Sequence, residues 1–254
     1  MEKQDLLYEG KSKKVYATND PARLIVAYKD EKGAVNNHIS NAVMRMLERE
    51  GVPTHLVRQL SERETVVRRV RMIPLEIIVR NVVAGKLSTL IGQPEGTRLR
   101  SPVLEYRYKA ASLGNPMINR FHVFALELCT PEMLDEIDRL AFRINKILKQ
   151  QLLRAGIRLI DCKLEFGCLP DGSIVLADEI SPDTSRLWDA ETGRKLGKDR
   201  FRRDLSNTIE AYQEILERGE CTSLKTLAVT GNDLIRAGHP AGPALGELLS
   251  RLLD

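Results

Sequence analysis

Two charged segments joined by a short turn constrain this chain more than any other part of its sequence. Residues 161–167 read DCKLEFG, and residues 174–183 read IVLADEISPD. Between them, Pro170-Asp171-Gly172-Ser173 has the composition of a tight hairpin turn, with glycine where a positive φ is needed. Because side chains alternate between the two faces of a strand, the charged and apolar residues of the first segment are predicted to separate. The charged face carries Asp161, Lys163 and Glu165, and the apolar face carries Cys162, Leu164 and Phe166.

The turn also predicts a register. If Asp171 and Gly172 form the loop, Glu165 lies directly opposite Asp178. Two facing carboxylates repel each other, and a divalent cation between them would cancel this repulsion. Hard oxygen ligands suit Mg²⁺, which usually completes its shell with phosphate oxygens, and Lys163 supplies a positive charge for phosphate. The pattern therefore predicts a Mg²⁺ site at Glu165 and Asp178. The alternative is a solvated hairpin face, which the apolar segments on either side disfavour.

The composition sets the class of protein. At 254 residues and 43% hydrophobic, the chain can bury a substantial core as one large domain or two lobes. We expect no membrane span and no signal peptide, because no apolar stretch is long enough and the N-terminus reads MEKQD. Four cysteines without a CxxC pair predict reduced thiols in a cytoplasmic protein. The net charge of +4 is too small to indicate a nucleic-acid-binding protein; it fits anionic small substrates equally well, and ordinary surface charge better still.

The order of the predicted elements indicates an α+β fold. Strands are expected within residues 6–27, at Thr65-Val66-Val67 and at residues 76–79, with a break at Met72-Ile73-Pro74. A helix is expected around residues 39–47. A long helix is predicted to open at Thr130-Pro131 and to end at Gly156, and another is expected over residues 201–216.

A basic turn near the N-terminus is a further candidate site. Tyr8-Glu9-Gly10-Lys11-Ser12-Lys13 places a glycine and lysines between two strand segments, where backbone N–H and ammonium groups could follow a polyphosphate. It matches neither the Walker A nor the GxGxxG pattern, so a solvated basic turn is the alternative. His38, His55, His122 and His239 show no partner pattern and are expected to be structural or exposed.

Taken in order, these segments resemble one family, the SAICAR synthetases (phosphoribosylaminoimidazole-succinocarboxamide synthases). The resemblance runs from about Leu6 to about Glu217. The motifs that carry it are Tyr8 to Lys11, Val35-Asn36-Asn37, Glu76 to Asn81, Asp161 to Gly167, Asp178 to Asp183, Arg186 to Asp189 and Lys198 to Arg202.

The resemblance implies an ATP-dependent ligase of purine biosynthesis. It would join carboxyaminoimidazole ribotide to L-aspartate and release ADP and phosphate. Lys11 and Lys13 would hold the ATP phosphates, and Val67 and Met72 would flank the adenine. Lys163, Glu165 and Asp178 would be the catalytic residues and would serve nucleotide and Mg²⁺. The imidazole nucleotide and its phosphate would be bound by Arg80, Lys86, Lys109, Asp161, Arg186, Lys198 and Arg202.

The implied architecture is two-lobed, with a small antiparallel-sheet lobe over a larger mixed lobe and ATP in the cleft. The predicted division is a strand-rich ATP-binding lobe over residues 1–79, a larger α+β lobe over residues 80–219 and a helical appendage over residues 220–254. Association of several copies is left open.

The chain departs from the family pattern on the side of the acceptor substrate. A longer loop with a Ser/Thr-Ala-x-Asp/Asn-Gly signature is missing between Tyr28 and Val35. Lys86 replaces a serine, Ala111 a carboxylate, and Asn115 the aspartate of an Asp-Pro pair. Two alternatives therefore stay open. One is an ATP-using paralogue with another acceptor, either a kinase or another carboxylate ligase, and the other is a non-catalytic nucleotide-binding protein.

The C-terminal tail lies beyond the family's usual end. Residues 227–253 resemble a short motif near the C-terminus of CCA-adding tRNA nucleotidyltransferases, without that enzyme's catalytic domain. Because the tail has few Lys and Arg residues, a packing appendage is favoured over RNA binding.

Overall fold

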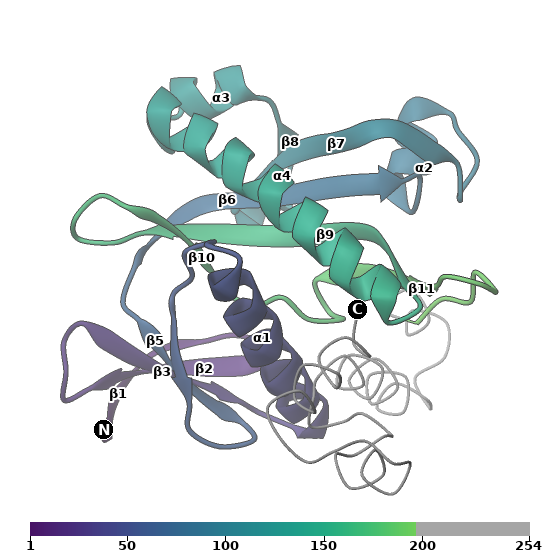
Figure 1. Cartoon of the computed structure of the whole chain (residues 1–254). Coiled ribbons are helices and arrows are strands. Elements are labelled where there is room, and N and C mark those ends of the chain that lie inside the picture. The colour runs from purple at the N-terminus through teal and green to yellow at the C-terminus, as the bar shows by residue number, and fades with distance from the viewer. Residues whose placement is uncertain (197–254) are drawn as a thin grey trace, which may run out of the picture.

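The computed structural model describes residues 1–196, which fold into two antiparallel sheets with helices packed against them (Figure 1). The first sheet forms the small lobe, in the strand order β1-β2-β3-β5-β4. Its strands are β1 (Lys3–Glu9), β2 (Lys13–Thr18), β3 (Arg23–Tyr28), β4 (Leu56–Gln59) and β5 (Glu64–Arg68). The strands expected within residues 6–27 and at residues 65–67 are confirmed.

Helix α1 (Glu31–Arg49) packs against β3, β4 and β5 of the small lobe. It starts directly after β3 because the Asp30 side chain accepts a hydrogen bond from the backbone N–H of Gly33, at 2.7 Å. Gly51, with φ of +74°, follows its end. Only Lys29 and Asp30 separate β3 from α1, so the chain makes this connection without a long loop.

The second sheet forms the core of the large lobe, in the order β10-β9-β6-β7-β8, with β11 also paired to β9. Its strands are β6 (Arg71–Val82), β7 (Arg98–Tyr108), β8 (Met117–Ile118), β9 (Ile157–Cys168), β10 (Ile174–Ala177) and β11 (Ser185–Asp189). The helices of this lobe are α2 (Lys86–Ile91), the 3-10 turn Ala111–Leu113, α3 (Arg120–Ala125) and α4 (Pro131–Arg154).

Helix α4 lies across β6 and β9 and covers the apolar face of the large sheet (Figure 1). Thr130 caps it by accepting from the backbone N–H of Met133, and Pro131 occupies the first turn, as predicted. Cys162, Leu164 and Phe166 of β9 are buried in the core beneath the helix. The predicted alternation of β9 is therefore confirmed, and the opposite face of the sheet is left for charged side chains.

Strand β6 passes through the break predicted at Met72-Ile73-Pro74, so that prediction is wrong. Proline cannot donate to a strand ladder, but the pairing of β6 with β9 has a register irregularity between Met72 and Glu76. Pairing of β6 with β7 begins only at Leu75. Pro74 thus occupies a position where no ladder hydrogen bond is required of it.

The predicted register of the hairpin is also wrong, by one residue. Glu165 pairs with Ala177, and Leu176 with Phe166, because the connection is a five-residue turn over residues 169–173. Gly172 adopts a φ of +86° in this turn, and the Asp171 side chain accepts from the backbone N–H of Ser173.

The boundary between the lobes follows the sheets. The predicted division after residue 79 falls inside β6, a strand that belongs wholly to the large sheet. We therefore propose that the lobes divide at Arg69 and Val70, between β5 and β6. The helix expected over residues 201–216 and the tail lie outside the described residues.

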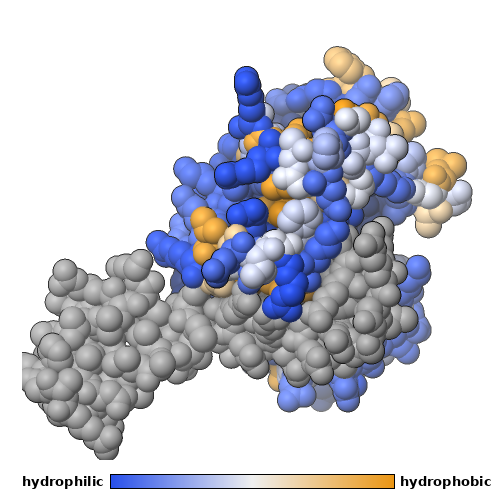
Figure 2. Space-filling view, turned by 90° about the vertical axis from the view of Figure 1, so that its right-hand side faces the viewer, coloured by the Kyte–Doolittle hydropathy of each residue, from blue (hydrophilic) through white to orange (hydrophobic). Residues whose placement is uncertain are grey.

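The face on the right of Figure 1, which carries α2, is mainly hydrophilic, with apolar residues in small separate groups (Figure 2). Leu90 and Ile91 of α2 are among the exposed apolar residues of the described chain. Within residues 1–196 no helix combines the length and the apolar character that a membrane crossing requires.

Candidate functional site

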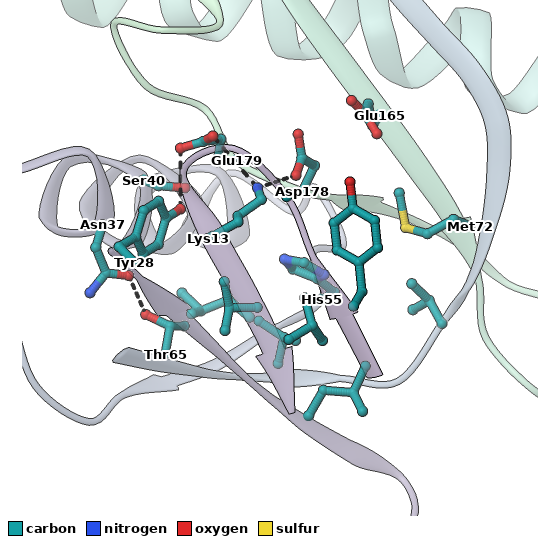
Figure 3. Close-up of a pocket in the computed structure, with 18 of the residues that line it drawn as sticks. Lys13, Tyr28, Asn37, Ser40, His55, Thr65, Met72, Glu165, Asp178 and Glu179 are labelled. Atoms are coloured by element: carbon teal, nitrogen blue, oxygen red, sulfur yellow. Dashed lines mark hydrogen bonds and ion pairs between the residues drawn. The ribbon is translucent and has the colours of Figure 1, made fainter. Parts of the chain in front are cut away.

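A cavity of about 670 Å³ lies between the small-lobe sheet, α1 and the charged end of the large sheet (Figure 3). Its walls differ in chemistry. Apolar side chains of the small lobe line one region, namely Val15, Leu24, Val26, Leu56 and Val67. Met72, at the start of β6, borders the same region. This part of the cavity suits a flat apolar group, such as a heterocyclic base.

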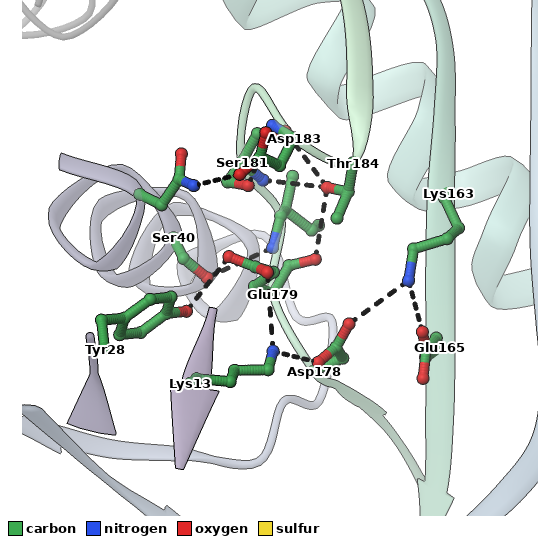
Figure 4. A network of polar contacts seen from close by, with 12 residues as sticks. Lys13, Tyr28, Ser40, Lys163, Glu165, Asp178, Glu179, Ser181, Asp183 and Thr184 are labelled. Atoms are coloured by element: carbon green, nitrogen blue, oxygen red, sulfur yellow. Dashed lines mark hydrogen bonds and ion pairs between the residues drawn. The ribbon is translucent and has the colours of Figure 1, made fainter. Parts of the chain in front are cut away.

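Charged side chains gather where the cavity meets β9 and the end of β10. We call this group the site cluster, and it comprises Lys13, Lys109, Lys163, Glu165, Asp178 and Glu179. Figure 4 shows Lys13 between Asp178 and Glu179, and Lys163 between Asp178 and Glu165. The longer contacts are 3.4 Å from Lys163 Nζ to Asp178 Oδ2 and 3.5 Å from Lys13 Nζ to Glu179 Oε1.

Asp178 reaches the site cluster by an irregular backbone. β10 ends at Ala177, and Asp178 adopts a φ of +58°, which interrupts the strand alternation. As a result, the carboxylates of Asp178 and Glu165 both pair with Lys163, although the two acidic residues are not cross-strand partners. The predicted meeting of the two carboxylates is thus present in the structure, reached by a different geometry.

The electrostatics of the site cluster favour ion pairs. Burial alone would raise the pKa of Asp178, but Lys13 and Lys163 outweigh it and hold that pKa below its ordinary value. Burial would likewise lower the pKa of Lys13, and Asp178 and Glu179 raise it instead. The pKa of Lys163 is raised in the same way, against burial, by Asp178 and Glu165. Lys13, Lys163 and Asp178 are therefore charged at neutral pH.

Helix α1 and the loop after β10 fix the acidic side of the cluster. The hydroxyl of Tyr28 donates to Glu179 Oε2 at 3.2 Å, and the Ser40 hydroxyl accepts from the backbone N–H of Ile180 at 3.2 Å. Farther along the loop, Asn36 Nδ2 donates to Asp183 at 2.6 Å, and Lys32 pairs with Asp183 at 2.8 Å. The short β3–α1 connection thus brings α1 into direct contact with the residues that follow β10.

A second charged group, which we call the buried network, lies on the same face of the large sheet and consists of Arg80, Glu105, Asp161 and Arg186. The Arg80 guanidinium grips Glu105 through two bonds of 2.6 and 2.9 Å and donates to Asp161 at 3.0 Å. Arg186 donates to the same Asp161 oxygen at 2.5 Å. The guanidinium of Arg80 therefore donates its hydrogen bonds to carboxylates of the protein itself.

The remaining predicted residues are scattered around these two groups. Lys11 lies in the β1–β2 turn and lines the cavity. Lys109 pairs with Glu165, so it lies at the site cluster. Lys86 is exposed at the first position of α2. Lys198 and Arg202 lie outside the described residues.

Four residues at these groups were not singled out from the sequence. Glu179 had a signal, since it directly follows Asp178. Tyr28 and His55 line the cavity, and Glu105 completes the buried network. These three come from strands or loops that are distant in sequence from the hairpin, and no local spacing pattern points to them.

Comparison with known proteins adds an independent finding. The sequence model of the SAICAR synthetase family matches residues 6–219. The phosphoribosylaminoimidazole-succinocarboxamide synthase of Coprothermobacter proteolyticus is 50% identical over 235 residues, which cover 87% of this chain and 100% of that protein. The one from Clostridium botulinum (strain Alaska E43 / Type E3) is 47% identical over 232 residues, covering 86% and 99%. The alignment with the first relative is 235 positions long but uses only 87% of the 254 residues of this chain, so that relative has some residues without a counterpart here.

Solved structures agree with the sequence comparison. The phosphoribosylaminoimidazole-succinocarboxamide synthase of Ehrlichia chaffeensis superposes with a TM-score of 0.83 at 37% identity, covering 85% of this chain and 98% of that one. A SAICAR synthetase in complex with ADP superposes with a TM-score of 0.80 at 43% identity, covering 83% and 96%. The predicted two-lobed α+β fold is confirmed.

Proposed function

The chain belongs to the SAICAR synthetase family, and from this premise we propose which of its residues perform the family's reaction. The reaction is the ligation of carboxyaminoimidazole ribotide and L-aspartate at the expense of ATP, in purine biosynthesis. The observation that carries the residue assignment is the site cluster at one end of a cavity that also contains an apolar region.

ATP is proposed to occupy the cavity with its adenine between Val67 and Met72. Both residues line the apolar region, as the family resemblance implies. The triphosphate would then extend toward Lys11 and Lys13 and reach Lys163. A structure of a relative with ADP bound supports nucleotide binding by this fold.

The charge balance of the site cluster favours a nucleotide that carries its own cation. Three lysines already neutralise three carboxylates, so neither free phosphate nor a free metal ion gains much there. Mg²⁺-ATP offers both groups a new partner, with phosphates for the lysines and the cation for the carboxylates. Among the described residues no group of three or more His, Cys, Asp or Glu side chains is arranged to hold a metal ion. Mg²⁺ commonly uses one or two carboxylates plus phosphate oxygens.

Glu165 and Asp178 are therefore the proposed Mg²⁺ ligands. When bound, the cation would neutralise charge on the transferring phosphoryl group. Lys163, which pairs with both carboxylates, would follow that charge as it develops and is the proposed catalytic lysine.

The carboxylate of the imidazole nucleotide needs activation, because oxide is a poor leaving group. Transfer of the γ-phosphoryl group to this carboxylate releases ADP and gives an acyl phosphate. Attack by the amine of aspartate then forms the amide and expels phosphate. The protein's part is to hold the reactants in line and to exclude water.

On the acceptor side, Arg186 is proposed to contact the phosphate of the imidazole nucleotide, because at 10% side-chain exposure it is the most accessible member of the buried network. Arg80 would act through Asp161, which it orients. Lys109 would lie between acceptor and ATP, given its pairing with Glu165. Lys86, Lys198 and Arg202 remain proposals from the family motifs.

The direct test is product formation. Purified protein is incubated with Mg²⁺-ATP, carboxyaminoimidazole ribotide and L-aspartate, and the succinocarboxamide product is quantified by mass spectrometry. We expect product with the native chain and at least a hundredfold less with Glu165→Gln. Glu62→Gln, the same chemical change at an exposed position between β4 and β5, is the matched control and should retain activity.

The outcomes separate the alternatives. Nucleotide binding without product would indicate another acceptor, and transfer of phosphate to a substrate without release of free phosphate would indicate a kinase. Equal activity in Glu165→Gln would overturn the assignment of the site cluster. A cytoplasmic location and association of several copies remain predictions.

A further inference from the structure

Glu179 differs from the other two carboxylates of the site cluster in the kind of partner that it has. Asp178 and Glu165 each pair with two lysines. Glu179 instead divides its two oxygens, with Oε1 3.5 Å from Lys13 Nζ and Oε2 accepting from the hydroxyl of Tyr28 at 3.2 Å. A hydroxyl carries no charge, so an incoming phosphate attracts it far less than it attracts a lysine. The bond from Tyr28 to Glu179 can therefore persist when the lysines turn to a ligand.

The backbone on both sides of Glu179 is fixed to the small lobe. Before it, the N–H of Leu176 donates to the carbonyl of Pro53 at 2.9 Å, and the N–H of His55 donates to the carbonyl of Leu176 at 2.8 Å. After it, the N–H of the next residue donates to the Ser40 hydroxyl at 3.2 Å. These bonds place the backbone but leave the direction of the Glu179 carboxylate to its own side-chain contacts.

Tyr28 is well held in the wall of the cavity. It is the last residue of β3 and only 7% of its surface is exposed. Gly33 of α1 packs so closely on it that a Cβ on this glycine would lie 2.8 Å from the Cβ of Tyr28. Burial, together with the charge of Glu179, raises the pKa of Tyr28, so the hydroxyl keeps its proton and donates. Figure 4 shows this hydroxyl directed at Glu179.

Tyr28 also lies beside the lysine that Glu179 binds. The Nζ atom of Lys13 is 5.9 Å from the centroid of the Tyr28 ring, within the range of a cation–π contact. In the proposed function, Asp178 turns to Mg²⁺ and Lys13 turns to the phosphates. Glu179, held by Tyr28, then stays beside Lys13 as its counter-ion.

We infer that Tyr28 is a positioning residue for the ligation: its hydroxyl fixes Glu179, and Glu179 keeps the Lys13 ammonium at the place where it meets the phosphates of ATP. This inference rests on the proposed function, because it assumes that Lys13 binds those phosphates. The effect of Tyr28 passes through Glu179 and Lys13, and its hydroxyl contacts neither the nucleotide nor Mg²⁺.

The test measures the binding of Mg²⁺-ATP and of adenosine by calorimetry in the native chain and in Tyr28→Phe. The variant keeps the ring and its packing and loses only the hydroxyl, so the chain should fold as before. The dissociation constant of Mg²⁺-ATP should rise on the order of fivefold, because Glu179 loses the bond that fixes it. The dissociation constant of adenosine should not change, because adenosine has no phosphate for Lys13 to bind.

Tyr106→Phe is the matched control. The Tyr106 hydroxyl lies 2.8 and 2.7 Å from the two oxygens of Asp138, so this variant also loses a bond from a tyrosine to a carboxylate. Tyr106 and Asp138 link β7 to α4 and are not among the residues that line the cavity. Tyr106→Phe should therefore bind both ligands as the native chain does.

A second comparison tests whether Tyr28 acts through Lys13. Lys13→Met alone should weaken the binding of Mg²⁺-ATP. Adding Tyr28→Phe to Lys13→Met should weaken it little further, because both changes act through one ammonium group.

Each result has a definite meaning. Native Mg²⁺-ATP affinity in Tyr28→Phe would overturn the inference while leaving the proposed function intact. An equal loss of adenosine affinity would do the same, since Tyr28 would then shape the whole cavity, and so would a full additional loss in the Lys13→Met background. Native affinity in Lys13→Met would overturn both the inference and the proposed role of Lys13 in binding the phosphates.

Discussion

The site cluster and the buried network pair acids with bases on one face of one sheet, yet water reaches them very differently. In the site cluster, the side chains of Lys13, Asp178 and Lys163 are 16%, 18% and 23% exposed. In the buried network, Arg80 and Asp161 are only 3% and 2% exposed. The same sheet therefore carries one charged group whose lysines and Asp178 open to a cavity and one whose Arg80 and Asp161 are sealed in the protein.

The difference in residue type matches the difference in exposure. Lysines are point charges on flexible stems, and they can exchange a carboxylate for a phosphate without leaving a charge unpaired. The Arg80 fork is fixed to Glu105 by two parallel bonds, and its release would strand a buried carboxylate. We conclude that the lysines of the site cluster are suited to exchanging partners with a ligand, and that Arg80 with Glu105 and Asp161 is suited to holding the shape of the sheet.

The largest expected effect is on the sealed side. Arg80→Met removes both bonds to the buried Glu105 carboxylate, leaves Asp161 with Arg186 as its ion-pair partner, and should lower the free energy of unfolding by about 3–5 kcal/mol. Lys13→Met should cost less stability, because Lys163 still pairs with Asp178. Urea unfolding of both variants measures the difference, and equal losses would contradict the distinction between the two groups.

His55 lies below the site cluster, and its burial should make the stability of the protein depend on pH. The ordinary pKa of His55 is 6.5, and burial lowers it to about 4 in the folded chain. Between these values the unfolded state binds more protons, so stability rises with pH and falls as pH drops. The loss between pH 6.5 and pH 4 should reach about 3 kcal/mol.

Urea unfolding across this range, without nucleotide, tests the effect. His55→Gln has no titrating group and should lack this part of the pH dependence. If the free energy of unfolding of His55→Gln changes with pH as it does in the native chain, His55 does not have the lowered pKa that burial implies.

The third prediction concerns the rim of the buried network. Gly85 has a φ of +56°, and a Cβ there would lie 2.6 Å from Arg186 Nη2. Gly85→Ala should therefore destabilise the protein by about 2 kcal/mol through backbone strain and displacement of Arg186. Gly92→Ala is the control, because Gly92 has a φ of +63° with nothing within 4 Å of a new Cβ. Gly85 also has a ψ of −133°, outside the left-handed helical region that Gly92 occupies with a ψ of 29°, so the two variants differ in backbone strain as well as in the Arg186 contact. Equal thermal shifts would mean that neither difference destabilises the protein.

The smallest effect sets the scale for an ion pair in open solvent. Glu136 and Arg139 of α4 pair at 2.6 Å with side chains 38% and 57% exposed. Glu136→Gln should cost only about 0.3 kcal/mol, and less in high salt. The free energy of unfolding is measured in urea. A loss in Glu136→Gln as large as that in Arg80→Met would mean that burial does not explain why the two ion pairs differ in their contribution to stability.

Local patterns in the sequence predicted much of this architecture. The alternation of β9 separates Asp161, Lys163 and Glu165 from the core, and Thr130-Pro131 starts α4. Such features depend on a few consecutive residues, so strand and helix periodicity suffice to find them.

The geometry of the site was harder to predict because it depends on distant segments. The hairpin register required knowledge of a five-residue turn, and the placement of Asp178 required its positive φ. Glu105 and His55 come from a neighbouring strand and from the small lobe, so they reach the buried network and the cavity only once the chain is folded. Pro74 continues β6 because the ladder is irregular there, which composition cannot reveal.

The pairing of Pro53 and His55 with Leu176 has a consequence for the order in which the chain matures. During synthesis the small-lobe strands leave the ribosome long before β10. The Pro53 carbonyl and the His55 N–H therefore have no Leu176 backbone to pair with until β10 emerges. Until then the apolar wall formed by Val15, Val26 and Val67 has no opposite side and faces solvent or a chaperone. A nascent chain can therefore complete the cavity proposed for ATP only when the hairpin that carries Glu165 and Asp178 has emerged.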